Sequence, residues 1–198
     1  MLIELFPVIL HLSKVENHQK IKDICMEYVE KEYPLNPSTF VDPWDADVFT
    51  TYGKNIDLPW DTIFTEYHNN IKDLANNFGI AGRPNVTEHW LNAYKKNQNQ
   101  EIHEHTPGHF AAVHYIKYDQ NDHLPTVFLN PYRQVSISNK PSFLTSDMNH
   151  VPPTYVAQSF VNVKEGDLLI FPAFLEHKVP RQQSDNLRVT LSFNFNFG

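Results

Sequence analysis

Two histidines separated by one residue stand in the segment QEIHEHTPGHF, at residues 100–110. Side chains alternate between the two faces of a β-strand, so a strand here would place His103 and His105 on one face and Glu104 on the other. Imidazoles about 6.6–7 Å apart along a strand can bind one metal ion, and the neutral ring suits iron, zinc, copper or nickel. The spacing therefore predicts a metal site that takes a third ligand from a distant strand.

The third ligand is predicted to be His177, near the end of the segment VKEGDLLIFPAFLEHKV at residues 163–179. Residues 164–167 are typical of a turn, and an apolar strand follows them. Phe171 and Pro172 then carry the chain over to His177. Such a connection can bring a late strand beside an earlier one, as a site of three histidines requires.

A buried anion-binding group is predicted eleven residues after His177, in the segment LRVTLSFNF. Strand alternation gives this segment a polar face with Arg188, Thr190 and Ser192, and an apolar face with Leu187, Val189, Leu191 and Phe193. A guanidinium beside a hydroxyl suits bidentate binding of a carboxylate. An arginine inside a barrel is costly without an anionic partner, and a bound dicarboxylate would supply one.

Each of these residues alone has a simpler interpretation. The chain contains 11 histidines, so one His-x-His pair can arise by chance, and His109, His114 and His123 are nearby competitors. A lone histidine is more often structural or at the surface, and a lone arginine is more often part of a salt bridge. The ordered set of His-x-His, Gly-Asp-Leu-Leu-Ile-Phe-Pro, His and Arg-x-Thr is far more specific than any one part.

A β-rich framework must position these residues, and the sequence after Pro84 is typical of one. Val, Ile, Phe, Tyr and Thr recur there between turn residues. Strands are expected at residues 86–95, 100–105, 109–118, 126–129, 134–138, 156–163, 167–171 and 187–197. The pattern predicts a mainly β fold with flanking α-helices, a double-stranded β-helix (jelly roll, cupin-like).

The sequence before Pro84 predicts helices that support this framework. Ser13 and Glu16 form a capping-box pattern at the start of one helix, and Gly79 is placed to cap the end of another. In order we expect a strand in 1–12, a helix in 14–32, a loop in 33–47, a strand in 48–52 and a helix from Pro59. No linker or repeat interrupts the pattern, which predicts a single domain over 1–198, with helical support in 1–80 and a jelly-roll core in 86–198.

Composition narrows the functional classes. A net charge of −7 argues against binding to nucleic acid, which usually requires a basic face. The single cysteine, Cys25, excludes an internal disulfide and is expected to be a buried apolar residue of the first helix. No apolar stretch reaches the roughly 20 residues that span a membrane, and a cytoplasmic location is expected.

Taken in order, the motifs resemble the 2-oxoglutarate/Fe(II)-dependent oxygenase family, close to its prolyl-hydroxylase-like group, which is common in marine bacteria and phages. The resemblance covers nearly the whole chain, and its C-terminal half is the specific part. It is carried by Trp90 and Asn92, by His103 and His105, by AAVHY at 111–115, by Phe128, Pro131 and Arg133, by Gly166, Asp167, Leu168, Phe171, Pro172, His177, Val179 and Pro180, and by Arg188, Thr190, Phe193 and Asn194.

The resemblance implies an enzyme that uses Fe(II), 2-oxoglutarate as cosubstrate and O2, and that hydroxylates a substrate with release of succinate and CO2. The implied catalytic and metal-binding residues are His103, His105 and His177. The implied cosubstrate-binding residues are Arg188, Thr190, Tyr94, Asn92 and Tyr115. A small-molecule or peptidyl substrate, such as an amino-acid side chain, is favoured. The oligomeric state stays open, with a homodimer as one alternative, and a phage-encoded enzyme would act in the bacterial host cytoplasm.

The sequence departs from the family pattern beside the metal strand. Thr106 stands in place of proline, residues 111–112 are Ala-Ala in place of Ser-Gly, and His114 replaces a tyrosine. These changes are expected to alter the substrate pocket. Most such oxygenases use two histidines and one carboxylate, so His105 would leave the iron one negative charge short. Whether His105 or a carboxylate is the second ligand stays open, and Glu104 could serve only through a β-bulge.

Two rival functions remain. A three-histidine, cupin-like dioxygenase would need no 2-oxoglutarate; His105 favours it, whereas Arg188 and Thr190 disfavour it. A non-catalytic jelly-roll module would bind a sugar or serve in a virion. Succinate production would distinguish the 2-oxoglutarate-dependent oxygenase from the first rival. Stoichiometric metal binding would distinguish it from the second.

Overall fold

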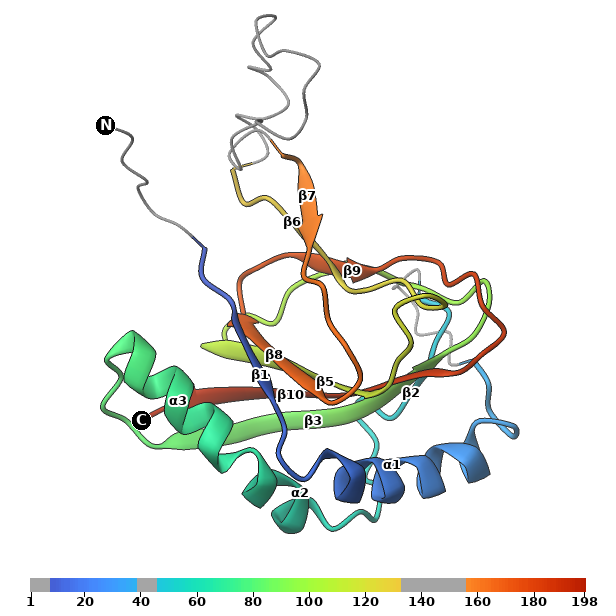
Figure 1. The fold of residues 1–198 in the computed structure, drawn as a ribbon, viewed down its shortest axis with the longest axis horizontal. Coiled ribbons are helices and arrows are strands. Elements are labelled where there is room, and N and C mark those ends of the chain that lie inside the picture. The colour runs from blue at the N-terminus through green and yellow to red at the C-terminus, as the bar shows by residue number, and fades with distance from the viewer. Residues whose placement is uncertain (1–7, 39–45, 133–155) are drawn as a thin grey trace, which may run out of the picture.

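The computed structural model describes residues 8–38, 46–132 and 156–198, and within them it contains ten strands and three helices (Figure 1). The elements before residue 80 are β1 (His11–Lys14), α1 (His18–Glu32), β2 (Phe49–Thr50), α2 (Trp60–Glu66) and α3 (His68–Phe78). The remaining strands are β3 (Pro84–Tyr94), β4 (Gln100–His103), β5 (Phe110–Lys117), β6 (Val127–Leu129), β7 (Gln158–Phe160), β8 (Asp167–Pro172), β9 (His177–Val179) and β10 (Arg188–Phe197).

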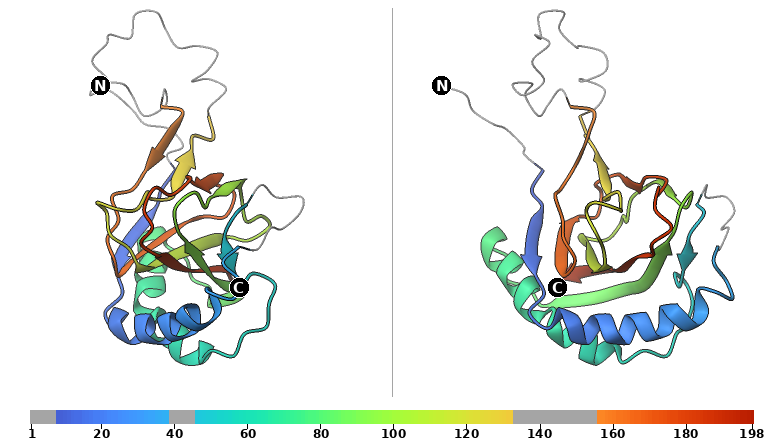
Figure 2. Two further views of the ribbon diagram at one scale, coloured as in Figure 1. Left: turned by 90° about the vertical axis from the view of Figure 1, so that its right-hand side faces the viewer. Right: turned by 45° about the vertical axis from the view of Figure 1, so that its right-hand side comes forward.

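The strands form two antiparallel sheets that face each other. The larger sheet has the order β1-β8-β5-β10-β3-β2, and the smaller has the order β4-β9-β6-β7. Figure 2 shows the helices on the outer side of the larger sheet and the smaller sheet across its inner side. The predicted fold class, a mainly β jelly roll with flanking helices, is confirmed.

The helices are fixed to the larger sheet by an apolar core. In α1, the side chains of Ile21, Cys25 and Val29 are fully buried, at the spacing that places them on one helix face. They belong to the same cluster as Leu191 and Phe193 of the central strand β10. Burial of such side chains stabilises the fold by about 1.5–3 kcal/mol each. This core holds the outer face of β10, while its inner face is left for polar residues.

The two longest strands, β3 and β10, carry the polar inner face. They pair Arg188 with Tyr94, Thr190 with Asn92, Ser192 with Trp90 and Asn194 with Glu88. Residues of β10 between these positions lie in the apolar core, so the predicted alternation of this strand is confirmed. The pairs run as a ladder along the interior between the sheets.

Several local predictions before residue 80 are wrong. The capping box does not form, because Ser13 is paired in β1 with Leu168 and α1 begins only at His18. The helix after Pro59 is divided at Tyr67 into α2 and α3. Gly79, at φ 67°, does cap α3 in the left-handed conformation, as predicted. Residues 1–7 of the expected first strand lie outside the described residues.

After Pro84, the predicted strands appear at β3 to β8 and β10 with small shifts of their ends. The strand expected at 134–138 lies outside the described residues. One strand was not predicted: β9, of only three residues, which pairs with both β4 and β6. The strands β1 and β2 from the N-terminal region join the larger sheet, but the assignment of 1–198 to a single domain stays a prediction.

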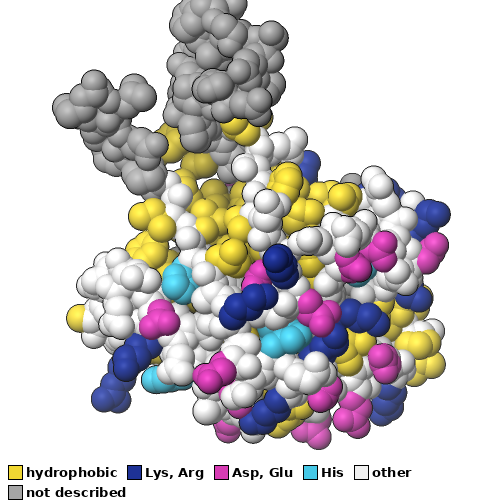
Figure 3. All heavy atoms as spheres, viewed as in Figure 1, with side chains coloured by type: hydrophobic (Ala, Val, Ile, Leu, Met, Phe, Trp, Pro, Cys, Tyr) yellow, Lys and Arg dark blue, Asp and Glu magenta, His cyan; other side chains and the backbone are white. Residues whose placement is uncertain are grey.

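The surface carries mixed charges. On the face seen in Figure 3, basic and acidic side chains are interspersed around α1. Cys25 is fully buried, as predicted, and burial raises the pKa of its thiol to about 12. None of the described helices is long and apolar enough to cross a membrane. The expected cytoplasmic location stays a prediction.

A histidine pair is buried between the larger sheet and the helices. His114 of β5 is fully buried, and its ring nitrogens contact the Tyr67 hydroxyl at 2.8 Å and His18 Nδ1 at 3.0 Å. Burial, with smaller contributions from His18 and Lys14, holds the pKa of His114 well below its ordinary value. Glu165 lies 3.6 Å from His18 on the outer side of the pair. His114 is therefore neutral in the folded protein at neutral pH.

This burial predicts an acid-sensitive fold. Below pH 6.5 the unfolded chain binds a proton at His114 that the folded chain does not, so stability is present above that pH and falls as the pH decreases. When the pH is lowered from 7.5 to 5.5, the free energy of unfolding should decrease in both proteins. The decrease should be about 1 kcal/mol smaller in His114→Gln than in the unchanged protein. Urea denaturation at both pH values measures this, with the exposed His68→Gln as control. Equal losses in all three proteins would contradict the burial of a neutral His114.

Candidate active site

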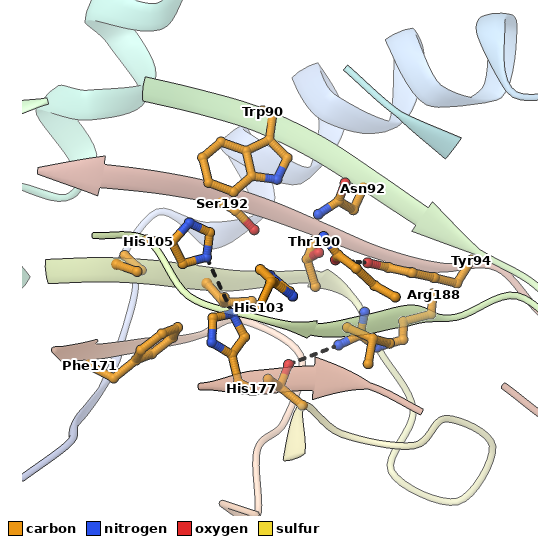
Figure 4. Close-up of a pocket in the computed structure, with 16 residues that line it drawn as sticks. Trp90, Asn92, Tyr94, His103, His105, Phe171, His177, Arg188, Thr190 and Ser192 are labelled. Carbon is orange, nitrogen blue, oxygen red and sulfur yellow. Dashed lines mark hydrogen bonds between the residues drawn. The ribbon is translucent and has the colours of Figure 1, made fainter. Parts of the chain in front are cut away.

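Three histidines converge between the two sheets. His103 ends β4 and is paired with His177 of β9, while His105 lies two residues beyond β4. One ligand nitrogen from each ring lies within 4.8 Å of the others, and Figure 4 shows the rings facing one another. Strand alternation was the wrong reason for placing His105, because β4 has ended there. Instead, its backbone N–H donates to the Ala173 carbonyl at 2.8 Å.

Backbone carbonyls fix the tautomers of two rings. His103 Nδ1 lies 2.8 Å from the carbonyl oxygen of Glu101, and His177 Nδ1 lies 2.9 Å from that of Leu175. A carbonyl can only accept, so each Nδ1 carries the hydrogen and donates it. In the neutral ring, each Nε2 then carries the lone pair, and one ligand nitrogen of each ring belongs to the cluster.

The electrostatics keep the three rings neutral. Burial lowers the pKa of His103, and burial together with the neighbouring His103 ring lowers the pKa of His105 to about 3. Burial and the two other rings hold the pKa of His177 well below its ordinary value. Neutral imidazole is the form that binds a metal ion.

The donor set fits a divalent metal ion. His105 Nε2 and His177 Nε2 are 3.3 Å apart, and the His177 atom carries no hydrogen. Without a cation, His105 must donate a hydrogen to it to avoid opposing lone pairs. A metal ion between the nitrogens would accept all three lone pairs instead. Three imidazoles suit iron, zinc, copper or nickel, and geometry alone does not choose among them.

Arg188 lies buried in the same cavity, and no described residue forms an ion pair with it. Its side chain is 1% exposed, and its Nε and Nη1 atoms have no hydrogen-bond partner among the described residues. Nη2 lies 3.4 Å from the Thr126 hydroxyl. Tyrosine rings surround the guanidinium, with centroids at 5.0, 5.5 and 5.9 Å for Tyr94, Tyr115 and Tyr118. A buried cation with unpaired donors is costly, so the site fits an anionic ligand, for which the planar fork of donors matches a carboxylate.

One cavity joins the histidine cluster to Arg188. It is narrow, with a volume of about 20 Å³, and its lining includes Asn92, Tyr94, Thr190 and Ser192 beside these residues. The Tyr94 hydroxyl donates to Gln100 at 2.9 Å. The Asn92 side chain satisfies its neighbours when its oxygen accepts from Trp90 Nε1 at 3.0 Å and its nitrogen donates to Thr50 at 2.8 Å. Polar side chains therefore line the path from the guanidinium to the histidines.

The structure brings together most of the residues that the sequence predicts. Tyr115 is the exception, because it does not line the cavity; it lies against Arg188 and donates to Thr126 at 3.1 Å. Thr126, Gln100 and Phe171 also line the cavity, and the sequence analysis did not assign them to it. No sequence signal marks Thr126, since its role depends on a contact formed only by folding.

The competing residues lie elsewhere. Glu104 is exposed and accepts a hydrogen bond from Thr106, and it is not part of the histidine cluster. His109 is exposed, and His123 Nε2 donates to the carbonyl of Asn186 at 3.1 Å. His114 faces the helices, so its replacement of tyrosine does not alter the cavity, contrary to expectation. Ala111 does line it.

A jelly roll whose interior joins three neutral imidazoles to a buried arginine is an arrangement that suits a non-haem metal-dependent enzyme. Residues 88–194 match the family described as "Putative 2OG-Fe(II) oxygenase", which covers more than half of the chain. The chain belongs to this family: it is a 2-oxoglutarate- and Fe(II)-dependent oxygenase. The predictions of enzyme class and of Fe(II), 2-oxoglutarate and O2 as its cofactors are confirmed.

Solved structures share the fold at low sequence identity. A Pseudomonas putida prolyl-4-hydroxylase has a TM-score of 0.59 at 10% identity, over 96% of this chain and 94% of that one. A viral collagen prolyl hydroxylase from Paramecium Bursaria Chlorella virus-1 has a TM-score of 0.56 at 11% identity, over 93% of this chain and 95% of that one. HygX from Streptomyces hygroscopicus, with nickel and 2-oxoglutarate bound, has a TM-score of 0.56 at 13% identity, over 96% of this chain and 82% of that one. A search of curated proteins found no match.

The unpaired arginine predicts an effect on stability. In protein without metal or 2-oxoglutarate, Arg188→Met should raise the unfolding free energy by roughly 1 kcal/mol or more, because it removes a buried cation and keeps the apolar stem volume. Urea denaturation measures this, with the exposed Arg181→Met as a control expected to stay within about 0.5 kcal/mol. A marked loss of stability in Arg188→Met would mean that the surrounding tyrosines and Thr126 already satisfy the guanidinium.

Proposed function

We propose that His103, His105 and His177 hold the Fe(II) of this oxygenase, and that Arg188 binds the distal carboxylate of 2-oxoglutarate. The observation that carries the proposal is the single cavity that links a cluster of three neutral imidazoles to a buried guanidinium with two unpaired nitrogens. Among the described residues, the guanidinium lacks an acceptor for its Nε and Nη1 atoms, and the three imidazoles form a donor set for a metal ion. One dicarboxylate with one divalent cation would suit both ends.

Neighbouring residues have supporting roles in this proposal. Thr190, next to Arg188 on the inner face of β10, supplies a hydroxyl to the same carboxylate. Tyr94 and Asn92 form the wall along the cosubstrate, and Tyr115 supports Arg188 from behind. When bound, Fe(II) and 2-oxoglutarate supply the oxidising chemistry with O2, and the products are succinate, CO2 and a hydroxylated substrate. The protein residues bind, orient and exclude water.

His105 makes the donor set differ from the usual two histidines and one carboxylate. Among the described residues, the metal-binding cluster contains no carboxylate, and Glu104 lies outside it. A three-histidine dioxygenase without a keto acid is therefore the second candidate. The unpaired Arg188 favours the use of 2-oxoglutarate, because direct binding of substrate to iron gives no reason for a buried guanidinium in the cavity.

The substrate is proposed to be a small molecule or a peptidyl side chain. Support comes from the fold shared with two prolyl hydroxylases and with HygX, which has been solved with hygromycin B bound. The sequence similarity to them is too low to carry their substrates over.

The metal assignment predicts a specific loss. His177→Ala should weaken Fe(II) binding by more than about 100-fold, since removal of a ligand exceeds the 10–100-fold effect of outer-shell changes. Anaerobic Fe(II) titration with metal analysis measures this, and the exposed His109→Ala is the matched control. His105→Asp, which supplies the usual carboxylate, should keep metal binding. Unchanged affinity in His177→Ala would remove the assignment.

The cosubstrate assignment predicts a separate loss. Arg188→Ala should raise the 2-oxoglutarate concentration for half-maximal succinate release by about 10–100-fold, because a charge-assisted pair of hydrogen bonds contributes about 1.5–3 kcal/mol. Fe(II) affinity should change little, and the exposed Arg181→Ala should match the unchanged protein. Oxygen-dependent turnover without any succinate from the unchanged protein would favour the three-histidine alternative.

A further inference from the structure

A second cleft opens beside the histidine cluster. It shares Trp90, Gln100, His103 and His105 with the cavity described above, so the two are continuous at the cluster. The cleft contains about 1340 Å³ of empty space, part of it open to solvent. It is therefore wide enough for a molecule larger than the cosubstrate to reach the histidines.

The ladder between β3 and β10 places this cleft opposite Arg188. The Arg188–Tyr94 pair stands at one end of the ladder, and the Asn194–Glu88 pair stands six residues along it. His105 lies toward the second end: its ring is 5.5 Å from the Trp90 ring, and its Nδ1 is 3.4 Å from Asn194 Nδ2. Figure 4 shows Arg188 and Tyr94 on one side of the histidines and His105 with Trp90 toward the other.

The charged side chains that line the cleft, among the described residues, are hydrogen-bond acceptors. Its charged lining residues, among those described, are the carboxylates of Glu88 and Glu104, without lysine or arginine. The Tyr52 hydroxyl at 3.0 Å and Asn194 Nδ2 at 2.7 Å both donate to Glu88 and hold it in place. A carboxylate accepts about four hydrogen bonds, so Glu88 keeps free capacity.

A buried acceptor in the same wall lacks a donor. Asn194 is 3% exposed, and its side-chain oxygen has no hydrogen-bond partner among the described residues. Two donors nearby are already engaged, since Trp90 Nε1 donates to Asn92 and the Thr106 hydroxyl donates to Glu104. The cleft thus offers negative charge and acceptors to whatever enters it.

Aromatic rings complete the wall. Tyr52 and Trp90 meet edge to face with centroids 5.1 Å apart, and both line the cleft. The faces of such rings attract cations, and most strongly that of tryptophan. Carboxylates and aromatic rings together favour an ammonium group over an alcohol or an acid of the same size.

We propose that the substrate of this enzyme carries a protonated amine, which Glu88 binds in the cleft with help from Glu104 and the Trp90 ring. The inference rests on the proposed function, because it takes the histidine cluster as the reaction centre. The amine can belong to a free small molecule or to a basic peptidyl side chain, and both present the same ammonium group to Glu88.

Binding of matched probes to the metal-free protein tests this, with tryptophan fluorescence as the readout because Trp90 lies in the wall. Nα-acetyl-lysine N-methylamide is compared with its Nε-acetylated, neutral counterpart, and n-pentylamine with n-pentanol. The charged member of at least one pair should bind about fivefold tighter, as expected for one partly exposed charge pair. A preference only in the lysine pair indicates a peptidyl source, and one in the pentylamine pair indicates a free amine. Equal affinities within both pairs would overturn the proposal.

Variants then test the assignment to Glu88. Glu88→Gln should reduce the charged-to-neutral affinity ratio toward one, and Glu88→Gln combined with Glu104→Gln should abolish it. Glu30→Gln, an exposed change on α1, should leave the ratio unchanged. A preference that survives the double change would overturn the assignment. A merely structural role of Glu88 would alter both affinities together and leave their ratio.

The outcome is separable from that of the proposed function. Succinate release by the iron-loaded, unchanged protein tests the oxygenase without any variant of the cleft. Succinate release without a preference for the charged probes would overturn only the substrate class. A preference for the charged probes without succinate release would overturn only the roles proposed for the histidines and Arg188.

Discussion

The interior of this protein depends on a buried guanidinium that has no counter-ion in the described part of the chain. Arg188 is held between tyrosine rings on the inner face of β10, where its Nε and Nη1 find no acceptor among the described residues. Such a group is unfavourable in the folded protein alone. It is tolerated because the outer face of the same strand lies in the largest apolar cluster, between sheet and helices. The strand thus separates the two tasks: one face stabilises the fold, and the other keeps a binding site ready for an anion.

The histidine cluster is also arranged for a ligand, but for a cation rather than an anion. Burial and mutual proximity keep the three rings neutral, and carbonyls of the chain direct the lone pairs of His103 and His177 inward. Three acceptors around one point are unfavourable without a cation. Both ends of the cavity are therefore arranged for ligands rather than for each other. Anion and cation together remove the two penalties, which explains how a small β-protein keeps so polar an interior.

The sequence predicted which side chains lie together better than it predicted the local structure, while their roles stay a proposal. The histidines and Arg188 line one cavity as expected, because ordered motifs can be recognised without knowledge of exact strand ends and because strand alternation in β10 is regular. Three features depended on tertiary contacts and could not be predicted. β9 is three residues long and exists through pairing with β4 and β6. His105 is oriented by the Ala173 carbonyl, and Thr126 meets Arg188 only across the folded interior. The false capping box at Ser13 failed because pairing with β8 outweighed a local helix signal.

The charge of the donor set connects the metal site to the cleft. In the proposed assignment, Fe(II) with three neutral imidazoles and a doubly charged 2-oxoglutarate has no net charge, whereas the usual carboxylate ligand would add one negative charge. The negative charge of this active site lies instead outside the donor set, on Glu88 and Glu104 in the adjoining cleft. Glu88 is tied to the cluster through Asn194, which reaches both its carboxylate and the His105 ring. A carboxylate in the cleft can attract a cationic substrate. A carboxylate bound to the metal would attract it only weakly, because the metal ion would neutralise its charge.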